Sequence, residues 1–210
     1  MKDQFLNEAE NLFKKFNGSL FGMARDDENI YKQFASYNLS DEQYLIWANE
    51  LATEHFNEVR KKNIWDNSFS SLFAVMKQYL LIENIRKVIS WIEENQHKLD
   101  SFTKIMYSES LSSLIDSSIA HEELLTISEK AKKLAVKMLE KVLDNPIEVH
   151  DSYLNDNFGI DLNNPEEVRQ RAKETLDSLN SSEERHKQIK LEREGIENQS
   201  FWEWLFSKKK

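Results

Sequence analysis

Apolar residues recur along most of this chain with the spacing of an α-helix. In the first segment they lie four, seven and eleven positions apart, which places them on one face of a helix. This stripe consists of Phe5, Leu6, Ala9, Leu12, Phe13 and Phe16. Asn17-Gly18 has the composition of a left-handed C-cap, which predicts that the helix ends there. Because the opposite face mixes acidic and basic residues, we expect the stripe to pack into a protein core rather than onto a membrane.

Capping residues and apolar spacing predict three helices in the next part of the chain. A short helix at residues 28–37 is followed by Ser40 and Gln43, whose spacing is that of a capping box. The capping box predicts a helix that ends near Lys62. Its apolar face carries Tyr44, Trp47, Ala48, Leu51, His55 and Val59. Residues 69–99 have few charges and a broad apolar arc, so we expect one central helix there, covered by several neighbours.

Three more helices are predicted before the charged tail. Asp100 can cap the first of them, and apolar spacing predicts the second at residues 122–143. Asn145 as cap, Pro146 at the first helical position and Gly159 beyond the end frame a third, short helix.

A charged tail helix is predicted to begin at Asn164-Pro165. Along it, residues spaced alternately by four and three positions form one seam of a heptad pattern. The seam contains Val168, Ala172, Thr175, Leu179, Ser182, His186, Ile189, Arg193 and Ile196. Because several of these residues are polar, three interpretations stay open: a marginal coiled-coil strand, an edge helix or a solvated arm. A continuous helix of this length would extend about 50 Å, at 1.5 Å per residue.

These patterns together predict an all-α protein. Only four Gly and two Pro occur among 210 residues, whereas a fold of many strands needs frequent turn residues. We expect a multi-helix bundle of about six to eight helices with a charged C-terminal helical arm. The predicted domains are a helical-bundle core at residues 1–160, the charged arm at 161–199, and an aromatic and basic docking tip at 200–210.

The tip places large aromatic side chains at the end of a densely charged stretch. Its candidate partner-binding residues are Phe201, Trp202, Trp204, Leu205, Phe206, Lys208, Lys209 and Lys210. A terminus without contacts is normally polar, so these rings need something to cover them. They can enter a groove on another protein, lie among the headgroups of an anionic membrane, or fold back into the helical body.

Composition and charge exclude several classes of function and partner. The net charge of −9 opposes binding to nucleic acid, whose phosphates must be neutralised by clustered basic residues. Cysteine is absent, which rules out disulfides, a thiolate nucleophile and Cys-ligated metals. No run approaches the roughly 20 apolar residues of a spanning helix, and the N-terminal segment lacks the apolar core of a secretory signal. We expect a cytoplasmic protein, and the abundance of Asn, Lys, Ile and Glu indicates a bacterial or phage source.

The histidines and carboxylates form few specific motifs. Glu94-x-x-His97 has the spacing of a di-iron helix motif, but it points away from the apolar stripe of its helix. Glu183-x-x-His186 has the same spacing and lies in the polar tail. His55 is on an apolar face, where we expect a core imidazole bonded to a backbone carbonyl or a carboxylate. No phosphate loop or nucleophile elbow is present, and we expect no cofactor.

His150-Asp151 is the most specific hint of an enzyme. With His121 upstream, the pair resembles the HD phosphohydrolase superfamily of all-helical metal enzymes. The resemblance implies that these three residues hold a metal that activates water. It also implies a distal acid, for which Asp177 is the candidate. The chain lacks the Gly-Lys that commonly follows the pair in that superfamily.

The aromatic tip therefore carries the main functional prediction. We expect a non-enzymatic protein for protein–protein interaction, an adaptor or regulatory component, whose tip docks to a partner. The alternatives are a metal-dependent phosphohydrolase of the HD type and attachment to an anionic membrane surface through the tip. The sequence leaves the oligomeric state open.

Overall fold

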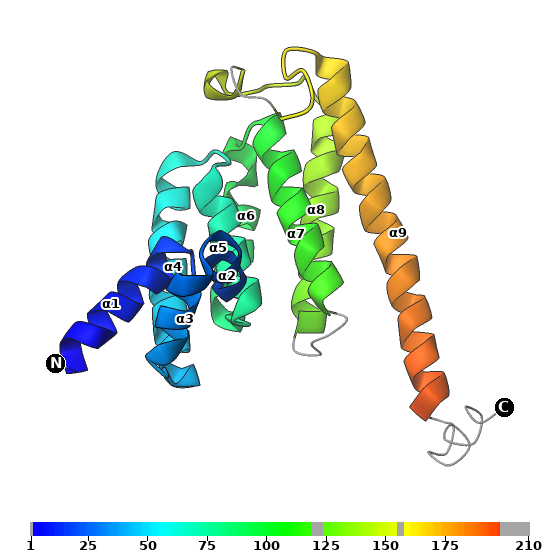
Figure 1. Ribbon diagram of the computed structural model, residues 1–210. Helices are drawn as coiled ribbons and strands as arrows, with labels where there is room; N and C mark the ends of the chain where they lie inside the picture. The colour runs from blue at the N-terminus through cyan, green and yellow to red at the C-terminus, as the bar shows by residue number, and fades with distance from the viewer. Residues whose placement is uncertain (1, 119–123, 155–157, 198–210) are drawn as a thin grey trace. The chain divides into compact units, whose positions relative to one another are not determined.

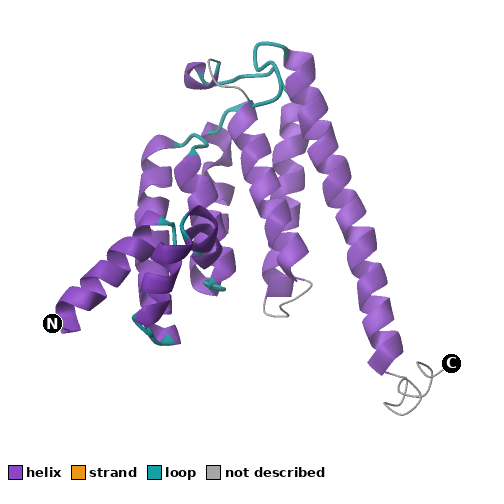
Figure 2. Cartoon of the chain, in the orientation of Figure 1, coloured by secondary structure: helices purple, strands orange, loops and turns teal. Residues whose placement is uncertain are grey.

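Helices form most of the structure (Figures 1 and 2). The computed structural model describes residues 2–118, 124–154 and 158–197. Within these ranges there are nine α-helices and no strand, which confirms the all-α prediction. The chain divides into two compact units, Met1–Met106 and Tyr107–Lys210. Among the described residues, none of the helices is both long enough and apolar enough to cross a membrane.

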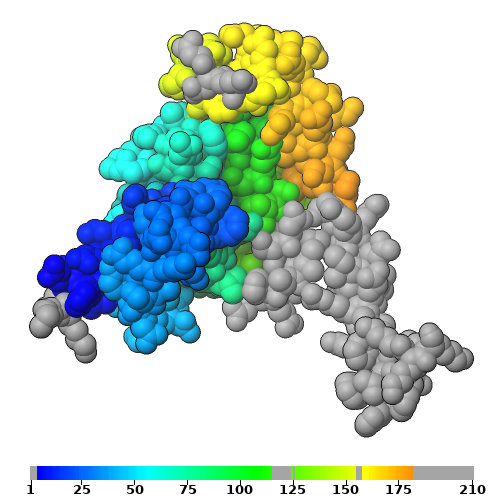
Figure 3. Space-filling model, in the orientation of Figure 1, coloured from blue at the N-terminus to red at the C-terminus, as the bar shows by residue number. Residues whose placement is uncertain are grey.

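The N-terminal unit consists of helices of 7 to 22 residues joined by short connections, with α2 and α3 at its surface (Figure 3). Its elements are α1 (Lys2–Lys15), α2 (Leu20–Asp26), α3 (Glu28–Ser36), α4 (Asp41–Lys62), α5 (Asn67–Gln78), α6 (Ile82–Asn95), the 3-10 turn η1 (Gln96–Lys98) and the start of α7 (Ser101–Ser118). As predicted, the Ser40 hydroxyl accepts the N–H of Gln43 at 3.2 Å, which caps α4. Asp100 likewise accepts the N–H of Thr103 at 2.6 Å. Helix α2 was not predicted, although the hydroxyl of Ser19 caps its first turn.

The region predicted as one central helix is two helices, α5 and α6. Helix α5 ends in a Schellman turn, in which the N–H of Leu81 donates to the carbonyl of Met76 at 2.9 Å. Leu80 takes the left-handed conformation in this turn, with a φ of 49°. This conformation costs a residue with a side chain about 1–2 kcal/mol of conformational free energy. Glycine or asparagine usually occupies it. The prediction of one helix was wrong because neither residue type marks this turn.

One buried phenylalanine ring joins four parts of the N-terminal unit. Phe13 of α1 is fully buried, and the nearest aromatic ring centroids lie 5.7 to 6.4 Å from its own. The neighbouring rings belong to Phe34 on α3, Tyr44 and Trp47 on α4, and Tyr79 after α5. Such a cluster combines burial of apolar area with favourable ring contacts. Core packing of the first stripe is thus confirmed at Phe13, whereas Phe5 near the N-terminus is 55% exposed.

Gly18 lets the chain turn closely past this ring cluster. Its φ is +71°, and a Cβ atom would lie 3.0 Å from Cζ of Phe13 and 3.2 Å from Cε2 of Tyr79. Its carbonyl accepts a hydrogen bond from the Tyr79 hydroxyl at 2.7 Å and another from the Gln78 amide at 2.9 Å. Burial raises the pKa of Tyr79 to about 12, so the phenol keeps its proton and its role as donor. The turn and the ring cluster therefore stabilise each other.

The second unit is built on the remainder of α7 and two further α-helices. Its other elements are α8 (Leu125–Asp144), the 3-10 turn η3 (Asp151–Tyr153) and α9 (Pro165–Glu197). Small or aliphatic side chains make up most of the buried surface of α8 and α9. They include Ala131, Ala135, Met138 and Val142 on α8, and Val168, Ala172 and Leu179 on α9. The hydroxyl of Ser108 on α7 donates to the carbonyl of Ala135 on α8 at 3.3 Å, so a serine allows α7 and α8 to approach closely.

The short helix predicted from Pro146 does not form. Residues 146–150 have no helical structure, and the turn η3 follows with His150 as its N-cap. Tyr153 in this turn is 4% exposed, and its ring meets that of Phe158 with centroids 6.0 Å apart. Burial of the tyrosine ring favours the tight turn, because a helix of few residues gains little from its own backbone hydrogen bonds.

We predict that Phe13→Ala destabilises the protein by about 3–5 kcal/mol, because it removes a fully buried ring from a packed cluster. Phe21→Ala on α2 is the matched control, since Phe21 is 77% exposed and its loss should cost less than about 0.5 kcal/mol. Urea unfolding followed by circular dichroism measures both variants. Equal effects in the two would contradict the central role of the ring cluster.

Candidate functional site

The residues predicted to form the docking tip lie outside the described part of the chain. This holds for Phe201, Trp202, Trp204, Leu205, Phe206, Lys208, Lys209 and Lys210. The structure bears on the tip through α9, the helix that leads to it. How α9 begins, packs and ends is therefore central to any role of the tip.

Helix α9 begins at a well-formed cap, at the position that the sequence predicted. The side-chain oxygen of Asn164 accepts the N–H of Glu166 at 3.1 Å. The carboxylate of Glu167 accepts the N–H of Asp161 at 2.7 Å and the side-chain amide of Asn164 at 3.1 Å. Both glutamates lie in the first turn, where negative charge interacts favourably with the helix dipole. The start of α9 is thereby fixed to the loop before it.

The first half of α9 is an edge helix packed on its own unit. Four successive positions of the predicted seam are buried: Val168, Ala172, Thr175 and Leu179. Of the three interpretations left open by the sequence, the structure therefore supports the edge helix for this half. The later seam positions, from Ser182 onward, lie beyond the residues whose side chains the structure describes.

Helix α9 is much longer than the helix on which it packs. It contains 33 residues, whereas α8 contains 20. At 1.5 Å per residue, the difference amounts to about 20 Å. Figure 1 shows the C-terminal part of α9 continuing beyond α8. The end of α9 that leads to the tip therefore lies away from the α8 surface.

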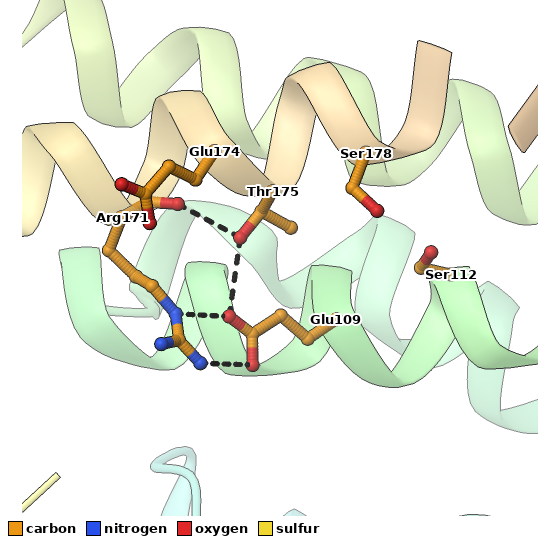
Figure 4. A pocket seen from close by; sticks show the side chains of 6 residues that line it. All are labelled: Glu109, Ser112, Arg171, Glu174, Thr175 and Ser178. Atoms are coloured by element: carbon orange, nitrogen blue, oxygen red, sulfur yellow. Dashed lines mark hydrogen bonds and ion pairs between the residues drawn. The ribbon is translucent and has the colours of Figure 1, made fainter. Parts of the chain in front are cut away.

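A polar cluster ties α9 to α7 (Figure 4). Nε and Nη2 of Arg171 donate to the two carboxylate oxygens of Glu109, at 2.6 and 3.1 Å. The Thr175 hydroxyl lies 3.2 Å from the same carboxylate and 2.9 Å from the carbonyl of Arg171. The hydrogen bond with Glu109 raises the pKa of Arg171, which stays charged. The cluster borders a pocket of about 310 Å³, which Ser112, Glu174 and Ser178 also line.

This cluster has the geometry of an anchor. Both oxygens of Glu109 accept hydrogen bonds from Arg171, in the bidentate arrangement that is the strongest form of this pair. The two side chains are 39% and 27% exposed, so screening by water limits the stabilisation to about 1 kcal/mol. The pair has no signature of its own in the sequence, because its members lie 62 positions apart. The one related sign in the sequence is that Arg171 and Thr175 are one helical turn apart, so both can face the same neighbouring side chain.

His55 is a half-buried histidine on the apolar side of α4. Its Nε2 lies 3.2 Å from the side-chain oxygen of Asn17. The sequence predicted a backbone carbonyl or a carboxylate as partner, and the structure shows a side-chain amide instead. Burial lowers the pKa of His55, while the nearby carboxylates of Glu54 and Asp66 act in the opposite direction. The contact joins α4 to the turn after α1, which gives the histidine a structural role.

The other candidate catalytic residues are dispersed. His150 and Asp151 are exposed in the turn η3, where Nδ1 of His150 lies 2.9 Å from the hydroxyl of Ser152. His121, the third residue of the HD resemblance, lies outside the described residues, and the distal candidate Asp177 is exposed on α9. Among the side chains that the structure describes, no group of three or more His, Asp or Glu residues is arranged to hold a metal ion.

Comparison with known proteins finds no relative: no family model, no curated protein and no solved structure matches this chain. Function must therefore be inferred from the residues and their geometry.

We predict that Arg171→Met lowers the free energy of unfolding by about 1 kcal/mol and speeds amide exchange in the first half of α9. Arg169→Met is the matched control on the same helix. Arg169 pairs with Glu166 one turn away, and that glutamate is 83% exposed. Nη2 of Arg169 also lies 3.5 Å from the carbonyl oxygen of Asn145, a long and exposed contact, so the total loss should stay below about 0.5 kcal/mol. Hydrogen exchange and urea unfolding measure both variants. Indistinguishable exchange in the two would show that the α7 contact does not hold α9.

We predict that His55 makes the protein less stable as the pH falls. Because burial lowers the folded-state pKa, the unfolded chain binds a proton more readily than the folded chain. The stabilising effect is present above the unfolded-state pKa of about 6.5 and is lost as the pH falls toward the folded-state value. Urea midpoints of the parent and of His55→Gln, measured across this pH range, should converge at acidic pH. Parallel pH profiles for the two proteins would contradict the assignment.

Proposed function

We propose that this protein is a non-catalytic interaction protein, an adaptor or regulatory component, whose C-terminal tip docks onto another protein. The docking residues are Phe201, Trp202, Trp204, Leu205, Phe206, Lys208, Lys209 and Lys210. The observation that carries the proposal is the length of α9, which has 33 residues against the 20 of α8. A helix that continues past its own packing partner is suited to present its end to something else.

The anchoring of α9 supports this arrangement. Asn164 caps its start, and the Glu109–Arg171 pair holds its first half to α7. In this proposal the charged arm of residues 161–199 acts as a spacer with one fixed end. The aromatic tip then begins directly after the free end of the spacer.

The tip has the chemistry of a protein-docking element. Ser200 can cap one helical turn that presents Phe201, Trp202, Leu205 and Phe206. Tryptophan and other aromatic residues commonly dominate the binding energy of protein interfaces, because one side chain buries a large area at a small entropy cost. A single amphipathic turn of this kind fits a hydrophobic groove on a partner.

Charge favours a protein partner over an anionic membrane. Residues 200–210 contain three Lys and one Glu and so carry a charge of +2. Because the whole chain has a net charge of −9, the rest of it carries −11. An anionic surface would attract the lysines by about 1 kcal/mol each but would repel the body behind them. A protein groove needs to accept only the tip. A cytoplasmic partner is part of the proposal, since a chain without cysteine suits a reducing compartment.

We predict that deleting residues 200–210 leaves folding intact and abolishes partner capture. The seam positions of α9 that the structure describes as buried, Val168 to Leu179, lie well before the deleted residues, so we expect the urea midpoint and the helical signal to stay unchanged. In-cell cross-linking of the full and truncated chains, followed by identification of the captured proteins, measures docking. If the truncated chain unfolds, the tip belongs to the core and the proposal fails.

Two sets of substitutions separate protein docking from membrane attachment. Trp202→Ala combined with Trp204→Ala removes the rings, and Lys208→Gln, Lys209→Gln and Lys210→Gln together remove the positive charge. For a protein partner, loss of the rings abolishes capture and loss of the charge only weakens it. Sedimentation with anionic vesicles that depends on the lysines would replace the proposed partner by a membrane.

A further inference from the structure

A groove lined by aromatic and basic side chains lies between α4 and α6 in the N-terminal unit. Its volume is about 400 Å³. The lining includes Phe56 and Arg60 from α4, and Arg86, Lys87, Trp91 and Glu94 from α6. We call it the α4/α6 groove. It is on the other unit from the tip, so the proposed docking of the tip does not account for it.

The two helices run in the same direction with a defined register. The side-chain amide of Asn84 donates to the side-chain oxygen of Asn49 at 3.4 Å. Farther along, the rings of Phe56 and Trp91 meet edge to face, with centroids 6.0 Å apart and an interplanar angle of 88°. In both pairs the α6 residue follows its α4 partner by 35 positions, which is the pattern of parallel neighbours. The register places the aromatic pair in the middle of the groove.

Cations stand on both sides of this aromatic pair. Arg60 follows Phe56 by one helical turn, and its guanidinium lies over that ring, 5.6 Å from the centroid. Lys87 precedes Trp91 by one turn on α6. With the observed register, Arg60 and Lys87 are about 12 Å apart along the helix axes, at 1.5 Å per residue. An apolar centre is thus flanked by two positive charges.

These cations differ from most others on the unit. Lys14, Lys32, Lys61 and Lys62 each form an ion pair with a nearby carboxylate. In the part of the chain that the structure describes, neither Arg60 nor Lys87 forms one. Arg86 pairs with the exposed Glu83, and Glu94 contributes a carboxylate to the lining. The groove therefore carries excess positive charge within a chain of net charge −9.

We propose that the α4/α6 groove binds an acidic peptide segment of a second partner protein. An apolar side chain of the peptide covers Phe56 and Trp91, and carboxylates on either side pair with Arg60 and Lys87. Guanidinium and ammonium groups are the usual partners of carboxylates, and half-buried rings offer a ready apolar surface. The 12 Å spacing matches carboxylates about seven residues apart on a helix.

Two features favour a peptide over a polyphosphate ligand. The net charge of the whole chain repels nucleic acid, and Glu94 would lie against any extended run of phosphates. A peptide presents few charges at fixed spacing, so it can pair with the two cations and avoid Glu94. The groove and the tip would then bind separate proteins, which is what an adaptor requires.

The test uses the full-length chain and a labelled helical peptide built on alanine. The peptide is about 16 residues long, which makes it partly helical, and carries two glutamates seven positions apart with Phe-Leu midway between them. Matched peptides replace the glutamates by glutamine or the Phe-Leu by alanine. Fluorescence anisotropy at two salt concentrations measures affinity, and urea unfolding checks that each protein variant is folded.

We predict saturable binding of the acidic peptide that weakens as salt increases. Arg60→Glu, Lys87→Glu and Trp91→Ala should each weaken binding at least about tenfold. Lys61→Glu is the matched control, because Lys61 is the neighbour of Arg60 on α4 but does not line the groove. It should change the affinity less than about twofold. Both matched peptides should bind at least about tenfold more weakly.

Several results would overturn the proposal. The first is no saturable binding of the acidic peptide by the parent protein. The second is an equal effect of Lys61→Glu and Arg60→Glu, which would indicate general attraction between charges. Tighter binding of a single-stranded oligonucleotide, or self-association that Lys87→Glu abolishes, would assign the groove to another occupant. The chain without residues 200–210 should bind the peptide as the full chain does, so this test is independent of the tip.

Discussion

Burial of the Phe13 ring is the constraint on which the N-terminal unit depends. The ring lies among side chains of α3, α4 and the end of α5, and Gly18 is the small residue that lets the chain turn beside it. Trp47, one of its neighbours, fixes the first half of α4. The second half of α4 then meets α6 in a parallel register, which brings Phe56 to Trp91. The groove is thus a consequence of a core that lies several turns away from it.

In the second unit, helix α9 is held by contacts of a different kind. Helix α9 buries mainly small side chains along α8, and each contributes less apolar area than the rings of the first unit. The Glu109–Arg171 pair fixes the orientation of α9 relative to α7. A bidentate contact has this geometric effect even where its energy is modest. An edge helix held in this way can continue beyond its neighbours without loss of its fixed end.

Elements with local signals could be predicted from the sequence, and features that depend on packing could not. Ser40 and Asn164 marked helix starts because a cap is a contact within one turn. The break at Leu80 was missed because leucine is neither glycine nor asparagine, the residue types that usually mark a left-handed turn. Phe56 and Trp91 carry no shared motif, and only the register of two separate helices brings them together. The docking role of the aromatic tip stays a prediction, because residues 200–210 lie outside the described part of the chain.

The length of α9 also bears on how an acidic protein can use basic binding elements. The lysines of the tip are attracted to the negative body of their own chain, and this attraction competes with any partner. Charges in water interact only weakly beyond the Debye length, about 8 Å at physiological salt. Helix α9 exceeds α8 by about 20 Å, at 1.5 Å per residue, so charges near α8 are largely screened from the free end of α9. In the proposed docking, the aromatic rings act only at contact and would therefore give the tip its specificity. The same reasoning applies to the peptide that we propose for the α4/α6 groove, in which the rings would select an apolar side chain and the cations its acidic neighbours.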